Sequence, residues 1–442
     1  MKSSRYNILV ELPGGKKLAF NSVTAALAEI DAETLPRFER LLRTPELTES
    51  PADDELRQQM NYARFLCADS LDEVSEQEQR NYEQRQSQHA FFLTVAPTLA
   101  CNFRCDYCFQ SASPVMMGTR TVEALLRFCE TRLASSEHLM ITWFGGEPTL
   151  CSKLIISVQQ RLAALAKRFD VKRISASIIT NGFLLDATLA QQYKDAGIDE
   201  AQITIDGPPE IHDRRRKLAG GRGTFATIIE NLAEVSRILR IVVRINVDSD
   251  NADAALQVVE ILRQQGLLPR VNIYFAPVNP AGGACSDAQG RCLSTQAFSN
   301  LQTRLYAELV ERGINRIEYP MIAPGGYCGA GHVNSYVVAP NGLLFKCWEE
   351  LSLDPALSVG DIFGDERSPQ QQRNFDRYEK WNPFTKSECR ECRILPLCLG
   401  GCPKAATDTA DTNHGYCSPW RYNLREMLVL RYLCNSQQEV NG

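Results

Sequence analysis

The chain has 442 residues, of which 44% are hydrophobic and 23% are charged, a composition typical of globular proteins. This length predicts a large enzyme domain with attachments, or two to three domains. The formal net charge of −5 argues against general attraction to nucleic acid or to a membrane surface. The sequence opens without a signal peptide and contains no run of about 18 apolar residues. We therefore expect a cytoplasmic protein, with no nucleic acid and no membrane among its partners.

The first part of the chain predicts a small region of mixed helix and strand. Residues 6–20 (YNILVELPGGKKLAF) predict two short strands around a Pro-Gly-Gly turn. Helical segments follow, and residues 75–90 predict a polar helix or a linker. We assign an α+β extension to residues 1–88.

The middle of the chain repeats a pattern of strand and then helix. The six predicted strands, rich in Val, Ile, Thr or aromatic residues, span 91–97, 138–146, 173–182, 200–207, 241–248 and 270–278. Helical periodicity fills most gaps, and Thr224 is the predicted N-cap of the helix that follows it. Strand starts separated by about 27 to 47 residues fit successive parallel βα units. The sequence therefore predicts an α/β fold, with a partial (β/α)6 barrel of the TIM-like type over residues 89–315.

Four short motifs follow or end these strands. They are the cysteine triplet in CNFRCDYC (101–108), GGEP (145–148), TNG (180–182) and DGPP (206–209). In βα barrels the chemistry gathers on the loops after the C-terminal ends of the strands. We therefore expect these motifs to crowd one rim of the barrel.

Cysteine usage favours metal sites made of thiolates alone, because the chain has 16 cysteines and only 5 histidines. Disulfide frameworks belong mostly to small secreted proteins. Cys101, Cys105 and Cys108 are closely spaced and have no fourth cysteine nearby. Three thiolates suit a [4Fe–4S] cluster in which one iron keeps an open coordination position, whereas a closed structural zinc site has all four positions filled by protein ligands.

Seven further cysteines are spaced across the C-terminal region. They are Cys328, Cys347, Cys389, Cys392, Cys398, Cys402 and Cys417. For the quartet from Cys389 to Cys402, a closed four-thiolate zinc site stays open as the alternative. Cys285 and Cys292 share a glycine-containing loop and are further ligand candidates. The remaining thiols are expected to be buried small hydrophobic residues, and these are Cys67, Cys129, Cys151 and Cys434.

The combination resembles the radical S-adenosylmethionine (radical SAM) family over residues 91 to about 280. CNFRCDYC resembles the CxxxCxxC loop of that family, GGEP resembles its SAM-binding turn, and TIDGPPEIHDRRRK resembles its SxDGxxxxHDxxR segment. The resemblance implies that the triplet holds a [4Fe–4S] cluster whose open iron binds SAM, and that SAM cleavage releases a 5′-deoxyadenosyl radical. The implied SAM contacts are Tyr107 near the adenine, the backbone of Gly145, Gly146 and Glu147 at the amino group, Asn181 near the ribose, and Thr204 and Arg216 at the methionine moiety.

Two features of the TIDGPPEIHDRRRK segment each have two possible interpretations. For His212, a functional role and a loop-capping role both stay open. For the basic run from Arg214 to Lys217, a solvated face is the alternative to a site.

The C-terminal cysteine pattern resembles that of SPASM domains, which carry two auxiliary [4Fe–4S] clusters. The resemblance implies that Cys328, Cys347 and Cys402 hold the first cluster. It assigns Cys389, Cys392, Cys398 and Cys417 to the second. The first cluster then lacks one thiolate, so either Cys285 or Cys292 completes it or one iron stays open. The implied cofactors are SAM and three [4Fe–4S] clusters, with the SPASM iron–sulfur domain at residues 316–442.

The resemblance extends to the substrate. In enzymes resembling anaerobic sulfatase maturases, an Asp follows the second SPASM cysteine and acts as a base, but this chain has Trp348 there. The C-terminal tail more closely resembles maturases of ribosomally made peptides, which install thioether or carbon–carbon crosslinks. We therefore expect a radical SAM oxidoreductase that abstracts hydrogen from a precursor peptide and installs an intramolecular crosslink. A formylglycine-forming sulfatase maturase, a radical enzyme acting on a small molecule and a zinc-stabilised interaction protein are the alternatives.

The expected partners are the precursor peptide and a flavodoxin or ferredoxin that donates electrons. Glu349, Glu350 and His332 are candidates for the base only because they lie near cluster ligands in the sequence. The extension at residues 1–88 is either a module that docks a peptide by strand addition or a cap on the open barrel.

Overall fold

The computed structural model describes residues 1–278, 290–322, 328–364, 366–407 and 416–441. The chain divides into two compact units. One comprises 1–86, 295–328 and 381–442, and the other comprises 87–294 and 329–380. Because the units interleave along the chain, they do not test the predicted domain boundaries. None of the described helices is long and apolar enough to cross a membrane.

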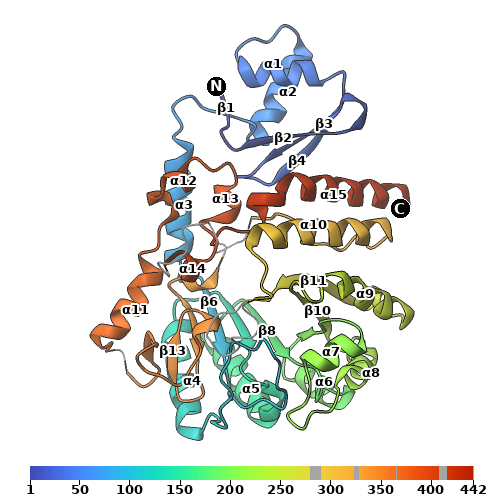
Figure 1. The fold of residues 1–442 in the computed structure, drawn as a ribbon. Coiled ribbons are helices and arrows are strands. Elements are labelled where there is room, and N and C mark those ends of the chain that lie inside the picture. Colours follow the sequence, from blue (N-terminus) through green and yellow to red (C-terminus); the bar gives the residue numbers. More distant parts are fainter. Residues whose placement is uncertain (279–289, 323–327, 365, 408–415, 442) are drawn as a thin grey trace. The chain divides into compact units, whose positions relative to one another are not determined.

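The predicted barrel strands are all present, and they pair in parallel and in chain order. These strands are β6 (Ala90–Val95), β7 (His138–Trp143), β8 (Arg173–Thr180), β9 (Glu200–Thr204), β10 (Arg240–Val247) and β11 (Val271–Pro277). The helices between them are α4 (Thr119–Leu133), α5 (Ser152–Arg168), α6 (Ala187–Asp195), α7 (Pro209–Arg215), α8 (Phe225–Val235) and α9 (Ala255–Gln264) (Figure 1). The sequence prediction of a partial βα barrel is therefore confirmed.

Strand β10 illustrates how the sequence divides the two faces of the sheet. Val243 and Ile245 are completely buried, as Leu232 of helix α8 is. Successive side chains of a strand point to opposite faces, so Arg244 and Asn246 lie on the other face. The helices thus cover the apolar face, and the face of β10 that carries Arg244 and Asn246 is polar.

Three strands that the sequence did not predict extend the same sheet. They are β12 (Ser335–Val338), β13 (Leu343–Phe345) and β14 (Gly360–Asp361). Strand β12 pairs in parallel with β6, whereas β13 and β14 add antiparallel strands beyond it. The sheet order runs from β11 at one end to β14 at the other, so within the described residues the barrel stays open. Helix α11 (Pro369–Glu379) belongs to the same unit.

The N-terminal residues form a three-stranded antiparallel sheet of β2 (Asn7–Glu11), β3 (Lys17–Asn21) and β4 (Ala26–Ile30). The two predicted strands around Pro-Gly-Gly are β2 and β3, and β4 is an addition. One face of the sheet packs Phe20 against Leu428, and the other packs Ala19 against Phe38. The remaining elements of this region are β1 (Lys2–Ser3), β5 (Leu66–Cys67), α1 (Leu35–Arg43), α2 (Pro51–Tyr62) and α3 (Glu73–Gln86), the last being the predicted polar helix.

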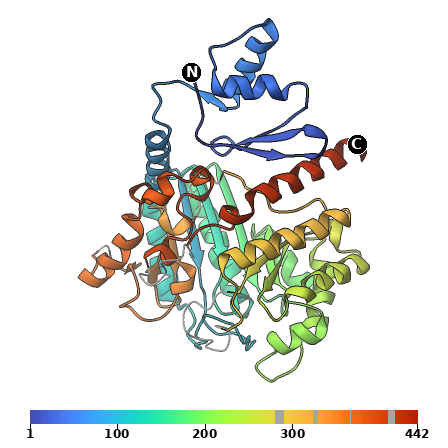
Figure 2. The same cartoon turned by 45° about the horizontal axis from the view of Figure 1, so that its top comes forward.

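Helix α10 (Thr295–Glu311) and helix α15 (Trp420–Asn441) run side by side in the first unit (Figures 1 and 2). The Asn423 side chain fixes the pair, because its Nδ2 donates to the Ser299 carbonyl at 3.1 Å and to Gln302 Oε1 at 3.0 Å. Short helices precede α15, and these are α12 (Ser387–Arg390), α13 (Leu395–Cys398) and α14 (Pro403–Thr407). The expected core thiols Cys67, Cys129, Cys151 and Cys434 are all buried.

Candidate functional site

The cysteine triplet lies in the loop that follows β6. Cys101, Cys105 and Cys108 are each partly exposed, and none forms a disulfide. The backbone of this loop pairs with residues 215–219, through Arg104 N to Lys217 O at 2.9 Å and Ala219 N to Asn102 O at 2.8 Å. The loop is thereby held against the segment that carries the predicted SAM-binding arginine.

The thiols of the triplet are suited to a metal rather than to free thiolates. Burial is the main cause that raises the pKa of Cys101 to about 11 and that of Cys105 to about 12, and the neighbouring thiol of Cys108 contributes to both shifts. The thiols are thus close enough to influence one another. Because a metal cation replaces the proton of a ligand thiol, bound iron would convert these groups to thiolates.

The GGEP turn lies directly against the start of the cysteine loop. Gly146 N donates to Thr98 O at 3.1 Å, and Glu147 N donates to Ala100 O at 2.8 Å. A Cβ atom at Gly146 would lie 2.3 Å from the Ala100 carbonyl oxygen, a distance that no side chain tolerates. Glycine is therefore required for the turn to approach the loop so closely.

The buried carboxylate of Glu147 joins this turn to the TNG motif. It accepts hydrogen bonds from Thr180 Oγ1 at 2.6 Å and from Asn181 N at 2.8 Å. Asn181 Nδ2 in turn donates to Asn102 Oδ1 in the cysteine loop at 2.8 Å. The ends of three strands therefore meet at one rim, as the sequence predicted.

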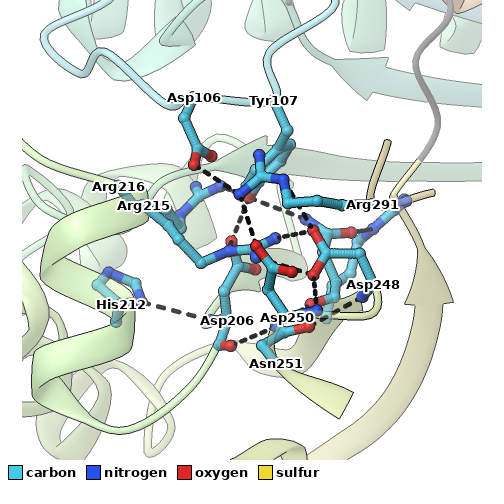
Figure 3. A network of polar contacts seen from close by, with 12 residues as sticks. Asp106, Tyr107, Asp206, His212, Arg215, Arg216, Asp248, Asp250, Asn251 and Arg291 are labelled. Atoms are coloured by element: carbon cyan, nitrogen blue, oxygen red, sulfur yellow. Dashed lines mark hydrogen bonds and ion pairs between the residues drawn. The ribbon is translucent and has the colours of Figure 1, made fainter. Parts of the chain in front are cut away.

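Tyr107 and Arg216 form the centre of a polar network beside the triplet (Figure 3). The Tyr107 hydroxyl donates to Asp206 and accepts from Arg216 Nη1 and from Asn246 Nδ2, the last at 3.1 Å. Thr204, the predicted methionine contact, ends strand β9 two residues before Asp206. The predicted SAM contacts from β9, α7 and the cysteine loop are therefore neighbours.

Arg216 fits the recognition of an anionic ligand. Its guanidinium donates to a neutral hydroxyl, and its buried Nε has no hydrogen-bond partner among the residues that the structure describes. A carboxylate is the natural partner of such a guanidinium. The cysteine triplet with its missing fourth ligand and this orphaned donor together fit a [4Fe–4S] cluster with SAM bound beside it.

Only two of the four basic residues from Arg214 to Lys217 are exposed to solvent. Arg214 and Lys217 are exposed, whereas Arg215 is 1% exposed and pairs with both oxygens of the buried Asp248 at 2.9–3.0 Å. Breaking such a buried pair costs about 3–5 kcal/mol. The sequence analysis did not separate Arg215 from its solvated neighbours.

The network continues to the cysteine loop through Arg291. Its Nη1 lies 3.0 Å from Asp106 and 3.5 Å from Asp250 (Figure 3). Sequence reasoning missed this arginine, because only the fold brings it to the loop between two predicted iron ligands. In strand β10, Arg244 and Asn246 alternate with apolar residues. This pattern was a signal that could have identified the polar face of the strand that contributes to the site.

His212 has the capping role that the sequence left open. Its Nδ1 accepts from Asp206 N at 3.3 Å, so its Nε2 carries the proton and lies 3.1 Å from Thr224 Oγ1. That hydroxyl donates to the Arg216 carbonyl at 2.7 Å. Burial and the adjacent arginines lower the pKa of His212, which keeps the ring neutral. His212 therefore positions Arg216.

Thr224 occupies the predicted N-cap position of α8, but its side chain does not cap the helix. The carboxylate of Asp213 accepts from Thr224 N at 2.7 Å and from Phe225 N at 2.8 Å instead. The predicted N-cap residue is therefore confirmed, and the capping hydrogen bonds come from Asp213 because the Thr224 hydroxyl is bound to the Arg216 carbonyl.

Two of the candidates for the base, Glu350 and His332, make polar contacts with other residues of the protein. Glu350 forms an ion pair with Arg377. His332 is 2% exposed, and its Nδ1 accepts from Asn334 N at 3.2 Å. Trp348 stacks on Phe144, with ring centroids 5.3 Å apart, and so lies next to the residue that precedes the GGEP turn.

The proposed ligands of the second auxiliary cluster share one hollow. It is partly open to solvent, and its lining includes Cys389, Cys392, Cys398 and Cys417. The rest of the lining is mostly apolar. Among the residues with described positions, no group of three or more His, Cys, Asp or Glu side chains is arranged to hold a single metal ion.

The ligands predicted for the first auxiliary cluster remain a prediction. Cys402 N donates to Tyr416 O at 2.8 Å, and Cys328 and Cys347 are partly exposed. Cys285 lies outside the described residues. Cys292 is partly exposed, and its pKa is raised by burial and by the nearby Asp248.

Comparison with known proteins shows which family the barrel region matches. Residues 95–260 match the Radical SAM superfamily. The chain is 24% identical over 369 residues to the serine-type anaerobic sulfatase-maturating enzyme of Bacteroides thetaiotaomicron, covering 73% of this chain and 85% of the relative. It is 24% identical over 339 residues to the PqqA peptide cyclase of Bradyrhizobium diazoefficiens, covering 72% and 84%.

Two solved structures share the fold. The structure of anSMEcpe with bound AdoMet and the Kp18Cys peptide matches with a TM-score of 0.61 and 18% identity, over 78% of this chain and 99% of that one. Streptococcus suis SuiB bound to the precursor peptide SuiA matches with a TM-score of 0.51 and 12% identity, over 95% of this chain and 97% of that one.

Proposed function

We propose that this radical SAM enzyme, which matches the superfamily over residues 95–260, installs a thioether or carbon–carbon crosslink in a ribosomally made precursor peptide. The observation that carries the proposal is the meeting of the cysteine triplet, the GGEP turn and Arg216 at one rim of an open barrel. An open barrel leaves room for a peptide side chain beside the SAM site.

The residues at this rim have separate tasks in the proposal. The triplet holds a [4Fe–4S] cluster, Arg216 pairs with the SAM carboxylate, and the backbone of the GGEP turn receives the SAM amino group. When bound, the cluster and SAM supply a 5′-deoxyadenosyl radical that abstracts a hydrogen atom from the peptide. A flavodoxin or ferredoxin is the proposed electron donor, and the C-terminal cysteines hold two auxiliary clusters.

The N-terminal sheet is the proposed docking place for the peptide. Strand β4 pairs with β3 on one side only, and among the described strands none pairs with its other edge. An extended peptide can add to such an edge through main-chain hydrogen bonds. The two relatives whose names include a peptide or a maturation role support a peptide substrate.

A formylglycine-forming sulfatase maturase is the second candidate. It is favoured by the sulfatase-maturating relative, which the alignment covers over 85% of its length. Against it stand Trp348 at the position of the expected Asp, packed on Phe144, and the engagement of Glu350 with Arg377. The crosslinking function therefore remains the first proposal.

Co-expression with candidate precursor peptides from small open reading frames near the gene, followed by mass spectrometry, tests the proposal. A crosslink removes one hydrogen from each joined atom, so the peptide is expected to lose two hydrogens. Co-expression with a Cys108→Ala variant is the control and should leave the peptide mass unchanged. An unmodified peptide beside iron-loaded wild-type enzyme would contradict the proposal, and conversion of Cys to formylglycine in a sulfatase peptide would establish the second candidate.

A further inference from the structure

Among the residues that the structure describes, one charged side chain lines the hollow of the second auxiliary site. Besides the four cysteines, the lining consists of Ile394, Leu395, Gly400, Tyr416 and Arg421. Lys386 and Glu388 contact Tyr416 but do not line the hollow. In an apolar surrounding a cation acts with little screening, so Arg421 influences any charge placed there strongly.

Arg421 is in direct contact with a proposed iron ligand. Its Nη1 donates to Cys417 Sγ at 3.7 Å. An arginine guanidinium keeps its positive charge in proteins. The contact is therefore a charge-assisted N–H···S hydrogen bond.

The fold fixes Arg421 in this position before any cluster is bound. Arg421 is the second residue of α15, and its N–H donates to Ser418 O at 3.1 Å. Leu424 and Leu428 of the same helix are buried against the N-terminal sheet. The positive end of the α15 helix dipole lies at the same end of the helix as Arg421, in its first turn.

We propose that Arg421 raises the reduction potential of the second auxiliary cluster, and the inference rests on the cluster ligands assigned under the proposed function. Reduction adds one electron, and therefore one negative charge, to a cluster already held by four thiolates. A fixed cation and an N–H···S bond stabilise that added charge, and both are known determinants of cluster potential. Arg421 thereby favours this cluster as an electron acceptor.

The test is a redox titration of full-length reconstituted protein followed by electron paramagnetic resonance. Every protein carries Cys101→Ala, Cys105→Ala and Cys108→Ala, so that only auxiliary clusters contribute to the signal. Arg421→Gln and Arg421→Met are expected to shift one of the two auxiliary potentials to a more negative value. A tenfold fall in the ratio of reduced to oxidised cluster at fixed solution potential corresponds to about 59 mV for one electron.

Two matched variants serve as controls. Arg425→Gln removes the same charge one turn further along α15, where Arg425 contacts the Leu9 carbonyl and does not line the hollow. It should leave both potentials unchanged. Arg421→Lys keeps the charge but loses the planar fork, so its shift should be smaller than that of Arg421→Gln.

The outcomes separate this inference from the cluster assignment. An unchanged potential in a charge-removing variant that keeps its iron overturns the role of Arg421. Loss of auxiliary iron from both charge-removing variants, with iron retained in Arg425→Gln, also overturns it, because Arg421 would then serve assembly only. Absence of iron from the triple-alanine parent rejects the proposed cluster sites themselves.

Discussion

Replacing Cys101, Cys105 and Cys108 together with alanine is expected to abolish SAM cleavage. The three thiols lie in one loop, influence one another, and have no fourth ligand nearby in the sequence. Without thiolates the loop has no ligand for a cluster, so no electron reaches SAM. We expect 5′-deoxyadenosine to fall below detection, and bound iron to fall by about one third if two auxiliary clusters remain. Chromatography of the dithionite reaction, with iron, sulfide and zinc analysis, measures both.

Cys129→Ala is the matched control for the triple variant. Cys129 is a completely buried thiol in α4, away from every predicted ligand set. This variant should keep both iron and SAM cleavage. Persistent 5′-deoxyadenosine formation in the triple variant would contradict the assignment of the triplet. Zinc without iron in the wild-type protein would support a zinc-stabilised interaction protein instead.

The second large effect is expected for Gly146→Ala. The added methyl group would meet the carbonyl oxygens of Ala100 at 2.3 Å and Leu99 at 2.6 Å, and backbone cannot move aside as a flexible side chain can. The GGEP turn and the start of the cysteine loop must therefore separate. Displacement of a reacting group by about 1 Å costs on the order of 100-fold in rate. We expect a loss of this size in 5′-deoxyadenosine formation, together with weaker SAM binding measured by calorimetry.

Gly118→Ala provides the comparison for this variant. Gly118 precedes helix α4, and a Cβ atom there would meet nothing within 4 Å. The variant should behave like the wild type in rate and in SAM affinity. Equal activity of Gly146→Ala and Gly118→Ala would mean that the close approach of turn and loop is not needed for SAM binding.

The barrel strands were predictable because each carries its own local signal. A stretch such as IVVRINV is rich in β-branched residues and lies between helical patterns of suitable length. Strand β12 was missed because it has only four residues and depends on parallel pairing with β6, more than 200 positions earlier in the chain. Such a pairing leaves no mark in the local sequence.

The site was predictable where a motif carries it and was missed where only the fold assembles it. The cysteine triplet, GGEP and Arg216 follow from motif and spacing. Arg215 and Arg216 have the same neighbours in sequence, yet only the fold shows that Arg215 is buried on Asp248. Arg291 reaches Asp106 across 185 positions of sequence, so no periodicity could have indicated their pairing.

Transfer of deuterium from the peptide to 5′-deoxyadenosine tests the central claim most directly. Reconstituted enzyme would be incubated with SAM, reductant and precursor peptide deuterated on its carbon positions, and both products analysed by mass spectrometry. The account predicts that 5′-deoxyadenosine gains deuterium and that the peptide loses it while becoming crosslinked. Formation of a modified peptide beside 5′-deoxyadenosine that contains no deuterium would contradict the account.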